Sequence, residues 1–437
     1  MDPPFTMGEA HTWYLDFVNT KYIPAESDLI CQFRVEPSEG IPMEEAVGRV
    51  ASESSNGTWT EVTTMKPRIR KLSAKAYKMD GYYVNIAYPV DLFEPGNMPQ
   101  IFSSIAGNIF GMKAVKNLRL EDIRWPRKII TSFKGPQFGI RGIREIFKEY
   151  KRPLTATVPK PKVGMTAVEH AKVGYEAWAG GIDLLKDDEN LTSQNFNKFS
   201  DRAKLALRLR DKAEKETGEK KSYLINVSSE TKEMMRRVKL AADLGCEYVM
   251  VDILTVGWAG LQTVRDECQD LHLAIHAHRA FHSTFTRNPN HGVSMLVLAE
   301  VARIIGVDQM HIGTVVGKLV GGKSEVQDLK EMLQGREVSA HDHVLGQKWY
   351  GRKNVLPVSS GGLHPGIVPD VIAMLGNDII IQAGGGVDGH PDGVRAGSAA
   401  LRQAIDASVQ KIPLAEYAKK HKELRRALEH WGYVKPV

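Results

Sequence analysis

A lysine and two acidic residues that follow one apolar run are the first candidates for chemistry in this sequence. The run at 182–186 ends in Lys186 and continues as Asp187-Asp188-Glu189-Asn190. If the run is a strand, Lys186 and Asp188 project to one face, and Glu189 turns over the rim. Carboxylates are the hard oxygen ligands that Mg²⁺ prefers, and a lysine amine that has reacted with CO₂ becomes a carbamate with a further anionic oxygen. The segment predicts one magnesium site per active site, formed by Asp188, Glu189 and Lys186 as a carbamate; a charged loop is the alternative.

Two glycine clusters are candidates for phosphate binding. Ser360-Gly361-Gly362 and Gly384-Gly385-Gly386 each stand between a predicted strand and a predicted helix. Glycine lets backbone N–H groups approach an anion, and the start of a helix favours negative charge. Arg279 and His311 could hold a second phosphate, because a guanidinium forks onto phosphate oxygens. The pattern predicts a small, doubly phosphorylated substrate.

A glycine-hinged loop carries one lysine. The stretch from Gly313 to Gly322 has glycines on both sides of Lys318. Such a loop can close over a substrate, exclude water and bring a cation to developing charge. An ordinary glycine-rich turn is the alternative.

Two histidine clusters are weaker candidates. His276, His278 and His282 could suggest a zinc site, but no suitably spaced further ligand is evident. His341-Asp342-His343 is better explained as a solvated loop.

The elements that must position these residues repeat regularly after residue 152. Short apolar runs alternate with amphipathic helical patterns such as those at 167–178, 232–244 and 294–305. The predicted strands are 154–159, 182–186, 223–227, 248–253, 273–278, 309–313, 355–359 and 379–382. Eight such units predict a (β/α)₈ barrel, with a doubly wound open sheet as the alternative. Most polar candidates fall at the carboxyl ends of these strands, where barrels of this kind place their active sites.

The region before the barrel has a different pattern. Strand-like runs at 29–35, 82–88 and 115–120 mix with helical runs at 43–52 and 98–105. This order predicts a smaller α+β domain of the ferredoxin-like kind. The predicted division is an N-terminal domain over 1–140 and a barrel with C-terminal helices over 141–437. The apolar spacing at 414–431 predicts a helix that packs on the barrel or on a neighbouring subunit.

Composition limits the classes of function. A net charge of +6 spread over 437 residues gives no basic patch, so neither nucleic acid nor a membrane is an expected partner. Cys31, Cys246 and Cys268 are widely spaced and are expected to be buried small side chains. Since the N-terminus lacks a signal pattern and no long apolar stretch occurs, a cytoplasmic location is expected.

With these residues in place, the sequence resembles the large chain of ribulose bisphosphate carboxylase/oxygenase along its whole length, and most of all the archaeal form III branch. The motifs that carry the resemblance are Lys160-Pro161-Lys162, Gly181 to Asn190, His278-Arg279-Ala280, Gly313 to Leu319, Ser360-Gly361-Gly362, Gly384 to His390, Glu53 to Thr60 and Gly107 to Gly111. The resemblance implies carboxylation of ribulose 1,5-bisphosphate by CO₂ to two 3-phosphoglycerate, a carbon–carbon lyase activity, with oxygenation by O₂ as a side reaction.

The resemblance also implies roles for single residues. Lys186 as the carbamate would take the C3 proton, Lys160 would move protons at C2, and Lys162 would support Lys160. Lys318 would hold the new carboxylate and pair with Glu53, and His278 would assist at the C3 oxygen. Asn108 would lie beside the metal, Ser360 would bond a substrate hydroxyl, and Arg279 with His311 would hold one phosphate. The other phosphate would contact Thr58, Trp59, Gly361, Gly362, Gly384 and Gly385.

The resemblance further implies a homodimer with active sites shared between subunits, in some cases a ring of dimers, and no small subunit. Val158-Pro159 and Ile312 depart from plant-type chains and leave substrate contacts and CO₂/O₂ discrimination open. A related enolase or isomerase of the same fold that does not fix CO₂ is the alternative function. The sequence does not choose between AMP and nucleoside salvage and a phosphoribulokinase-dependent cycle.

Overall fold

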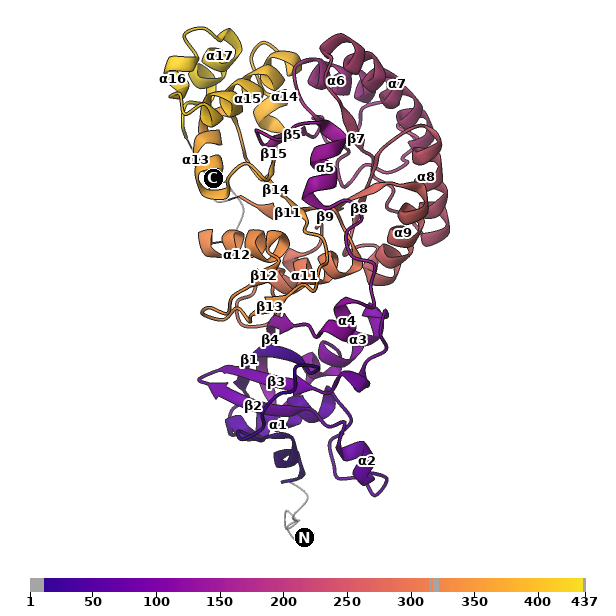
Figure 1. The fold of residues 1–437 in the computed structure, drawn as a ribbon, viewed down its shortest axis with the longest axis vertical. Coiled ribbons are helices and arrows are strands. Elements are labelled where there is room, and N and C mark those ends of the chain that lie inside the picture. The colour runs from indigo at the N-terminus through magenta and orange to yellow at the C-terminus, as the bar shows by residue number, and fades with distance from the viewer. Residues whose placement is uncertain (1–11, 315, 317–321, 435–437) are drawn as a thin grey trace, which may run out of the picture. The chain divides into compact units, whose positions relative to one another are not determined.

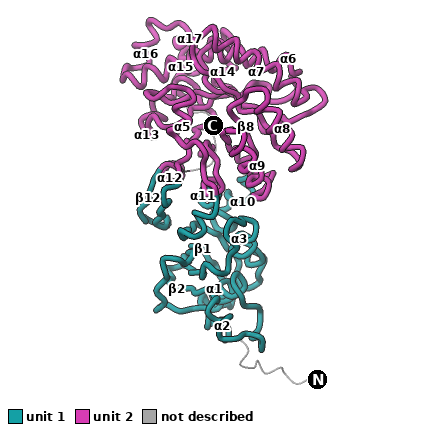
Figure 2. Tube along the Cα trace, turned by 45° about the vertical axis from the view of Figure 1, so that its right-hand side comes forward, with its two compact units in different colours: residues 1–133, 282–301, 335–352 teal, residues 134–281, 302–334, 353–437 magenta. Residues whose placement is uncertain are grey.

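The computed structural model describes residues 12–314, 316 and 322–434. The chain forms two compact units, shown in separate colours in Figure 2. Unit 1 combines residues up to 133 with 282–301 and 335–352, and unit 2 combines 134–281, 302–334 and 353–437. Within the described residues, no helix is long and apolar enough to cross a membrane.

Unit 1 is built on an antiparallel sheet. Its elements are β1 (Leu29–Pro37), α1 (Met43–Glu53), β2 (Lys75–Asp80), β3 (Tyr83–Tyr88), α3 (Met98–Ile105) and β4 (Val115–Arg124). The strands lie in the order β4-β1-β3-β2, each antiparallel to its neighbour. This is the ferredoxin-like arrangement that the sequence predicted. The sequence missed β2, an edge strand with one buried residue, Ala76, and therefore no apolar alternation to detect.

Short elements complete unit 1. They are η2 (Trp13–Phe17), α2 (Pro67–Arg70), η3 (Val90–Leu92), η4 (Asn108–Gly111), α4 (Arg127–Ile130), α10 (Ser283–Thr286), β10 (Gly292–Val293), β12 (Glu337–Val338) and β13 (Gln347–Lys348). Strand β10 pairs in parallel with β4, so a segment far along the chain extends the N-terminal sheet.

Unit 2 is a barrel of parallel strands (Figure 1). The strands are β5 (Leu154–Thr157), β6 (Leu184–Lys186), β7 (Ser222–Leu224), β8 (Tyr248–Asp252), β9 (Ala274–His278), β11 (Gln309–Gly313), β14 (Leu356–Ser360) and β15 (Ile380–Gln382). They run in the order β7-β6-β5-β15-β14-β11-β9-β8. The ring closes just after β7, where Met250 N donates to Ile225 O and Val227 N donates to Met250 O, at 2.8 and 3.1 Å. The predicted eight-stranded barrel is confirmed, and the open sheet is wrong.

A helix follows each barrel strand. These helices are α6 (Ala167–Ala179), α7 (Phe199–Thr217), α8 (Thr231–Asp243), α9 (Gly257–Leu271), α11 (Met295–Ile305), α12 (Lys323–Gln334), α13 (Val368–Leu375) and α15 (Val394–Val409). Helix α6 shows why one begins where it does, because Thr166 accepts from Glu169 N while Glu169 accepts from Thr166 N. Around the last strands lie η5 (Pro365–Ile367) and α14 (Gly385–Asp388), and α16 (Leu414–Tyr417) and α17 (Lys422–Trp431) end the chain.

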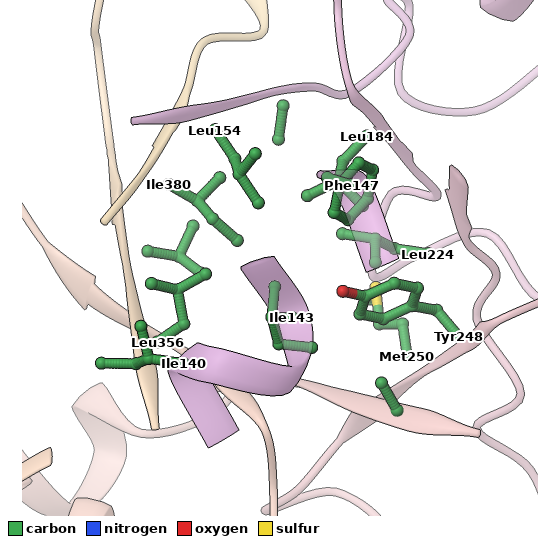
Figure 3. Packing of buried hydrophobic residues seen from close by; sticks show 13 residues of the cluster. Ile140, Ile143, Phe147, Leu154, Leu184, Leu224, Tyr248, Met250, Leu356 and Ile380 are labelled. Carbon is green, nitrogen blue, oxygen red and sulfur yellow. The ribbon is translucent and has the colours of Figure 1, made fainter. Parts of the chain in front are cut away.

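Helix α5 (Gly139–Phe147) closes the amino end of the barrel. Its Ile140, Ile143 and Phe147 pack against the first residues of several strands, among them Leu154 and Ile380 (Figure 3). No helix was predicted from the sequence in this region. The predicted domain division at residue 140 stays a prediction. Helix α5 spans that residue. The three cysteines are buried, as expected.

Candidate active site

Lys186, the last residue of β6, is the centre of the polar group at the carboxyl end of the barrel. Its side chain is 1% exposed, and its Nζ lies 2.8 Å from Asp187 O and 3.4 Å from Glu189 Oε2. The Lys160 Nζ, from the segment after β5, donates to Asp188 Oδ2 at 3.0 Å. Two strand ends therefore bring two amines and two carboxylates together, which a solvated loop would not do.

Asp187 has a different task from the acids that follow it. It is fully buried and accepts from Arg202 Nη2 and from Asn226 N, both at 3.0 Å, and from the hydroxyl of Tyr223. His170 Nε2 lies 3.2 Å from its other oxygen. Burial alone would raise the pKa of Asp187, but the charge of Arg202 and the bond to His170 hold it below its ordinary value. Asp187 anchors the segment, so Lys186 and Asp188 are held in place from behind.

Glu189 lies between Lys186 and His278. Its Oε2 is 3.5 Å from His278 Nε2, and His278 Nδ1 is 2.9 Å from Asp252 Oδ1 at the end of β8. Burial opposes ionisation of Glu189, but the charges of Lys186 and His278 outweigh it and lower the pKa to about 2. The sequence did not single out Asp252, which fixes the orientation of the His278 ring.

The donor set around Lys186 fits a magnesium ion when the lysine carries a carbamate. In the described part of the chain, no group of three histidine, cysteine or acidic side chains could hold a metal. Asp188 and Glu189 provide two carboxylates beside a buried amine. Mg²⁺ is commonly bound through one or two carboxylates together with water and substrate oxygens, so a third oxygen on Lys186 would complete a hard ligand set.

The two glycine clusters meet at the barrel mouth. A Cβ on Gly386 would lie 2.1 Å from Leu363 O, so only glycine allows this approach between the loops that follow β14 and β15. A Cβ on Gly384 would lie 3.0 Å from Lys160 Cε. The two loops thus form one surface beside Lys160, with Gly385 at the start of α14.

Arg279 and His311 lie on two neighbouring strands of the ring, after β9 and on β11, and β11 is also the neighbour of β14. Among the described residues, none accepts a hydrogen bond from the Arg279 guanidinium. Its burial lowers its pKa to about 10, against a smaller opposing effect of Glu325. A partly buried cation of this kind is suited to an anionic ligand. His311 Nδ1 lies 2.7 Å from Ser360 Oγ, so the predicted phosphate and hydroxyl contacts are neighbours.

Comparison with known proteins places this site in a family. The catalytic domain of the ribulose bisphosphate carboxylase large chain matches residues 139–431, and the N-terminal domain of the same chain matches 16–129. The chain belongs to the ribulose bisphosphate carboxylase large-chain family. A ribulose bisphosphate carboxylase from Pyrococcus abyssi is 51% identical over 97% of this chain and 98% of its own length. One from Methanosarcina barkeri is 50% identical over 95% of this chain and 99% of its own length.

Solved structures of the same family are similar to this chain over nearly its full length. A dimeric archaeal Rubisco from Hyperthermus butylicus superposes with a TM-score of 0.92 at 49% identity, over 96% of this chain and all of its own. An octameric Rubisco from Pyrococcus horikoshii, in complex with sulfate, gives a TM-score of 0.90 at 50% identity, over 97% of this chain and 98% of its own. The predicted resemblance to archaeal members of the family is confirmed.

Four of the site residues predicted for this chain do not lie in the barrel unit. Glu53, Thr58, Trp59 and Asn108 belong to unit 1. Glu53 ends α1 and is half-buried, whereas Trp59 is 78% exposed and Asn108 is exposed at the start of η4. In unit 2, Lys162 is exposed in the segment after β5. Lys318 lies outside the described residues, so the predicted closing loop stays a prediction.

Proposed function

We propose that this chain catalyses the carboxylation of ribulose 1,5-bisphosphate by CO₂, giving two molecules of 3-phosphoglycerate. The observation that carries the proposal is Lys186, a lysine buried to 1% exposure beside Glu189 at the mouth of a barrel. Relatives that share half of the sequence over nearly its full length bear the name of this carboxylase. Those names favour carboxylation over the CO₂-independent alternative.

Asp188, Glu189 and the carbamate of Lys186 would hold Mg²⁺. The bound ion would supply Lewis-acid stabilisation for the negative charge of the enediolate form of the substrate. The chain itself provides the closely held acids, and Asp187 keeps the segment from moving, since Arg202 and Tyr223 hold both of its oxygens.

Proton transfer would fall to Lys160, Lys186 and His278. Lys186 as the carbamate would accept the C3 proton, and Lys160 would deliver and remove protons at C2. His278 would assist at the C3 oxygen, with its ring oriented by Asp252 at 2.9 Å. Lys162, exposed in the same segment as Lys160, would add positive charge near C2.

Phosphate binding would divide between two sides of the mouth. Arg279 and His311 would hold one phosphate, and Ser360 beside His311 would bond a substrate hydroxyl. Backbone N–H groups of Gly361, Gly362, Gly384 and Gly385 would hold the other, together with Thr58 and Trp59. Lys318 would hold the carboxylate that forms and pair with Glu53.

Thr58, Trp59, Asn108 and Glu53 would come from a second copy of the chain. We therefore propose a homodimer with shared active sites as the smallest active form, with a ring of dimers as a larger form. A dimeric and an octameric Rubisco among the similar structures support both forms. Because O₂ can attack the same enediolate, oxygenation should accompany carboxylation.

One assay tests the activity. Purified protein given Mg²⁺, labelled bicarbonate and ribulose 1,5-bisphosphate should form labelled 3-phosphoglycerate, and a chelator should abolish the product. Unlabelled isomer of the substrate as the sole product would instead identify the CO₂-independent alternative. No turnover by folded, magnesium-loaded protein would reject both.

A further inference from the structure

A continuous row of polar side chains runs through the barrel from its core to Ser360. Tyr248, whose side chain packs in the cluster of Figure 3, accepts from Gln309 Nε2 at 3.0 Å. Gln309 Oε1 lies 2.9 Å from His276 Nδ1, and His276 Nε2 lies 2.9 Å from His311 Nε2. His311 Nδ1 then lies 2.7 Å from Ser360 Oγ. Four of the five residues are buried, with Ser360 half-buried at the mouth.

The amide of Gln309 gives this row a direction. Its Nε2 is used toward Tyr248, so its Oε1 faces His276 and can only accept. A neutral imidazole donates through one nitrogen and accepts through the other. Both histidines are kept neutral, because burial lowers the pKa of His276 to about 3 and that of His311 well below its ordinary value.

The same donor and acceptor order continues from His276 through His311 to Ser360 at the barrel mouth. With the proton of His276 on Nδ1, its Nε2 accepts from His311, and His311 Nδ1 must accept from the Ser360 hydroxyl. We propose that Gln309 and His276 are positioning residues that fix the tautomer of His311 and so leave Ser360 as a hydrogen-bond acceptor toward the substrate. This inference rests on the proposed contact between Ser360 and a substrate hydroxyl.

Ser360 would therefore select for a substrate group that donates a hydrogen bond. An accepting Ser360 oxygen favours a sugar hydroxyl and disfavours a carbonyl or ether oxygen at the same place, since two acceptors cannot bond. A row in the reverse direction would make Ser360 a donor and reverse this preference. Whether Ser360 donates or accepts is therefore set by Gln309, which lies three hydrogen bonds away from Ser360 along the row.

The protonation pattern can be observed in the wild-type protein. Neutron diffraction from a perdeuterated crystal should show deuterium on His276 Nδ1 and His311 Nε2, and none on the other ring nitrogens. Deuterium on His276 Nε2 and His311 Nδ1 would overturn the direction, whatever the protein's activity.

Kinetics test whether His276 acts through Ser360. In H276N the shorter amide cannot reach His311, and we expect the KM for ribulose 1,5-bisphosphate to rise about tenfold, the size of one net hydrogen bond. H276Q places an acceptor near the former Nε2 and should restore the KM to within about twofold of wild type.

The double-mutant cycle separates positioning from a general structural role. In an S360A background, H276N should leave the KM unchanged. An equal rise in KM in both backgrounds would overturn the coupling. An unchanged KM in S360A alone would overturn the proposed substrate contact, and with it the role of the row, while the neutron result would still stand for the row itself.

Discussion

The two ends of the barrel each contain a buried lysine with a glutamate beside it, and the ends differ in the other charged groups around that lysine. Lys221, just before β7 at the amino end, is fully buried, and its Nζ lies 2.8 Å from Glu219 Oε2. Nearby, Arg152 Nη1 and Nη2 bond the two oxygens of Asp183 at 2.7 and 2.9 Å. At the carboxyl end, Lys186 lies 3.4 Å from Glu189.

The difference lies in where the charges find their partners. At the amino end, each of these cations has a close acidic partner, as burial of charge requires. At the carboxyl end, Arg279 has no acceptor among the described residues, and amines and acids crowd around one point. The amino end is therefore built for stability, and the carboxyl end keeps charge available for ligands.

The largest difference between the two ends is expected when each buried lysine is replaced by an apolar residue. K186A should lower the carboxylation rate by about 10⁴-fold, the upper range for loss of a proton-transferring group. K221M should keep the rate within about threefold, because it lies far from the proposed chemistry. Steady-state rates with labelled bicarbonate measure both. Equal losses in the two variants would show that the ends do not differ in role.

Removing the arginine of the amino end should act on stability instead. R152M leaves Asp183 buried without its bidentate partner, and we expect a loss of about 4 kcal/mol in the free energy of unfolding. Urea unfolding measures it, with R141M on the exposed face of α5 as the control. A variant as stable as wild type would mean that the pair contributes nothing.

Removing the unpaired arginine of the carboxyl end should act on substrate binding. R279A should raise the KM for ribulose 1,5-bisphosphate about 30-fold, from the loss of about 2 kcal/mol of charge-assisted hydrogen bonding. The free energy of unfolding should stay close to that of wild type. R236A, an exposed residue of α8, is the matched control. An unchanged KM in R279A would remove Arg279 from the phosphate site.

Asp183 at the amino end should account for a measurable part of the acid-induced loss of stability, beside Asp187 and Glu189 at the carboxyl end, whose pKa values are also lowered. Burial raises the pKa of Asp183, but Arg152 outweighs it and lowers the pKa from 3.8 to about 2. A depressed pKa contributes stability above about pH 4 that is lost as the pH falls toward 2, here about 2 kcal/mol. Unfolding measured across this range should show a smaller pH dependence in D183N than in wild type. Identical dependence in both would contradict the assignment.

The sequence predicted the barrel because each strand is a short apolar run with a helix after it. It predicted the place of the polar residues because strands of a barrel end on one side. Strand alternation separated Asp188 from Asp187, but it did not predict that Asp187 anchors the segment, because the partner of Asp187 is Arg202 on the following helix. Helix α5 was missed although Ile140, Ile143 and Phe147 have helical spacing, and its packing against residues of several barrel strands is seen only in the folded ring.

The buried polar residues that organise the site were also beyond the sequence. Gln309 and Lys221 are polar residue types that are usually exposed, but both are fully buried in the structure. Tyr248, the partner of Gln309, lies on β8 and is recognised only once the strands form the barrel. Glu219 is two residues from Lys221, so for this pair only the burial of the lysine depends on the fold.

Helix α5 closes the amino end of the barrel, and this limits how substrates enter and products leave. Ile140, Ile143 and Phe147 fill that end, as expected for a packed barrel that is not a pore, so in the described part of the chain the carboxyl end is left as the opening for ligands. Sugar bisphosphate, CO₂ and both product molecules must pass through the same opening. Departure of the products therefore has to precede each new arrival, and 3-phosphoglycerate should compete directly with the substrate for the vacated mouth.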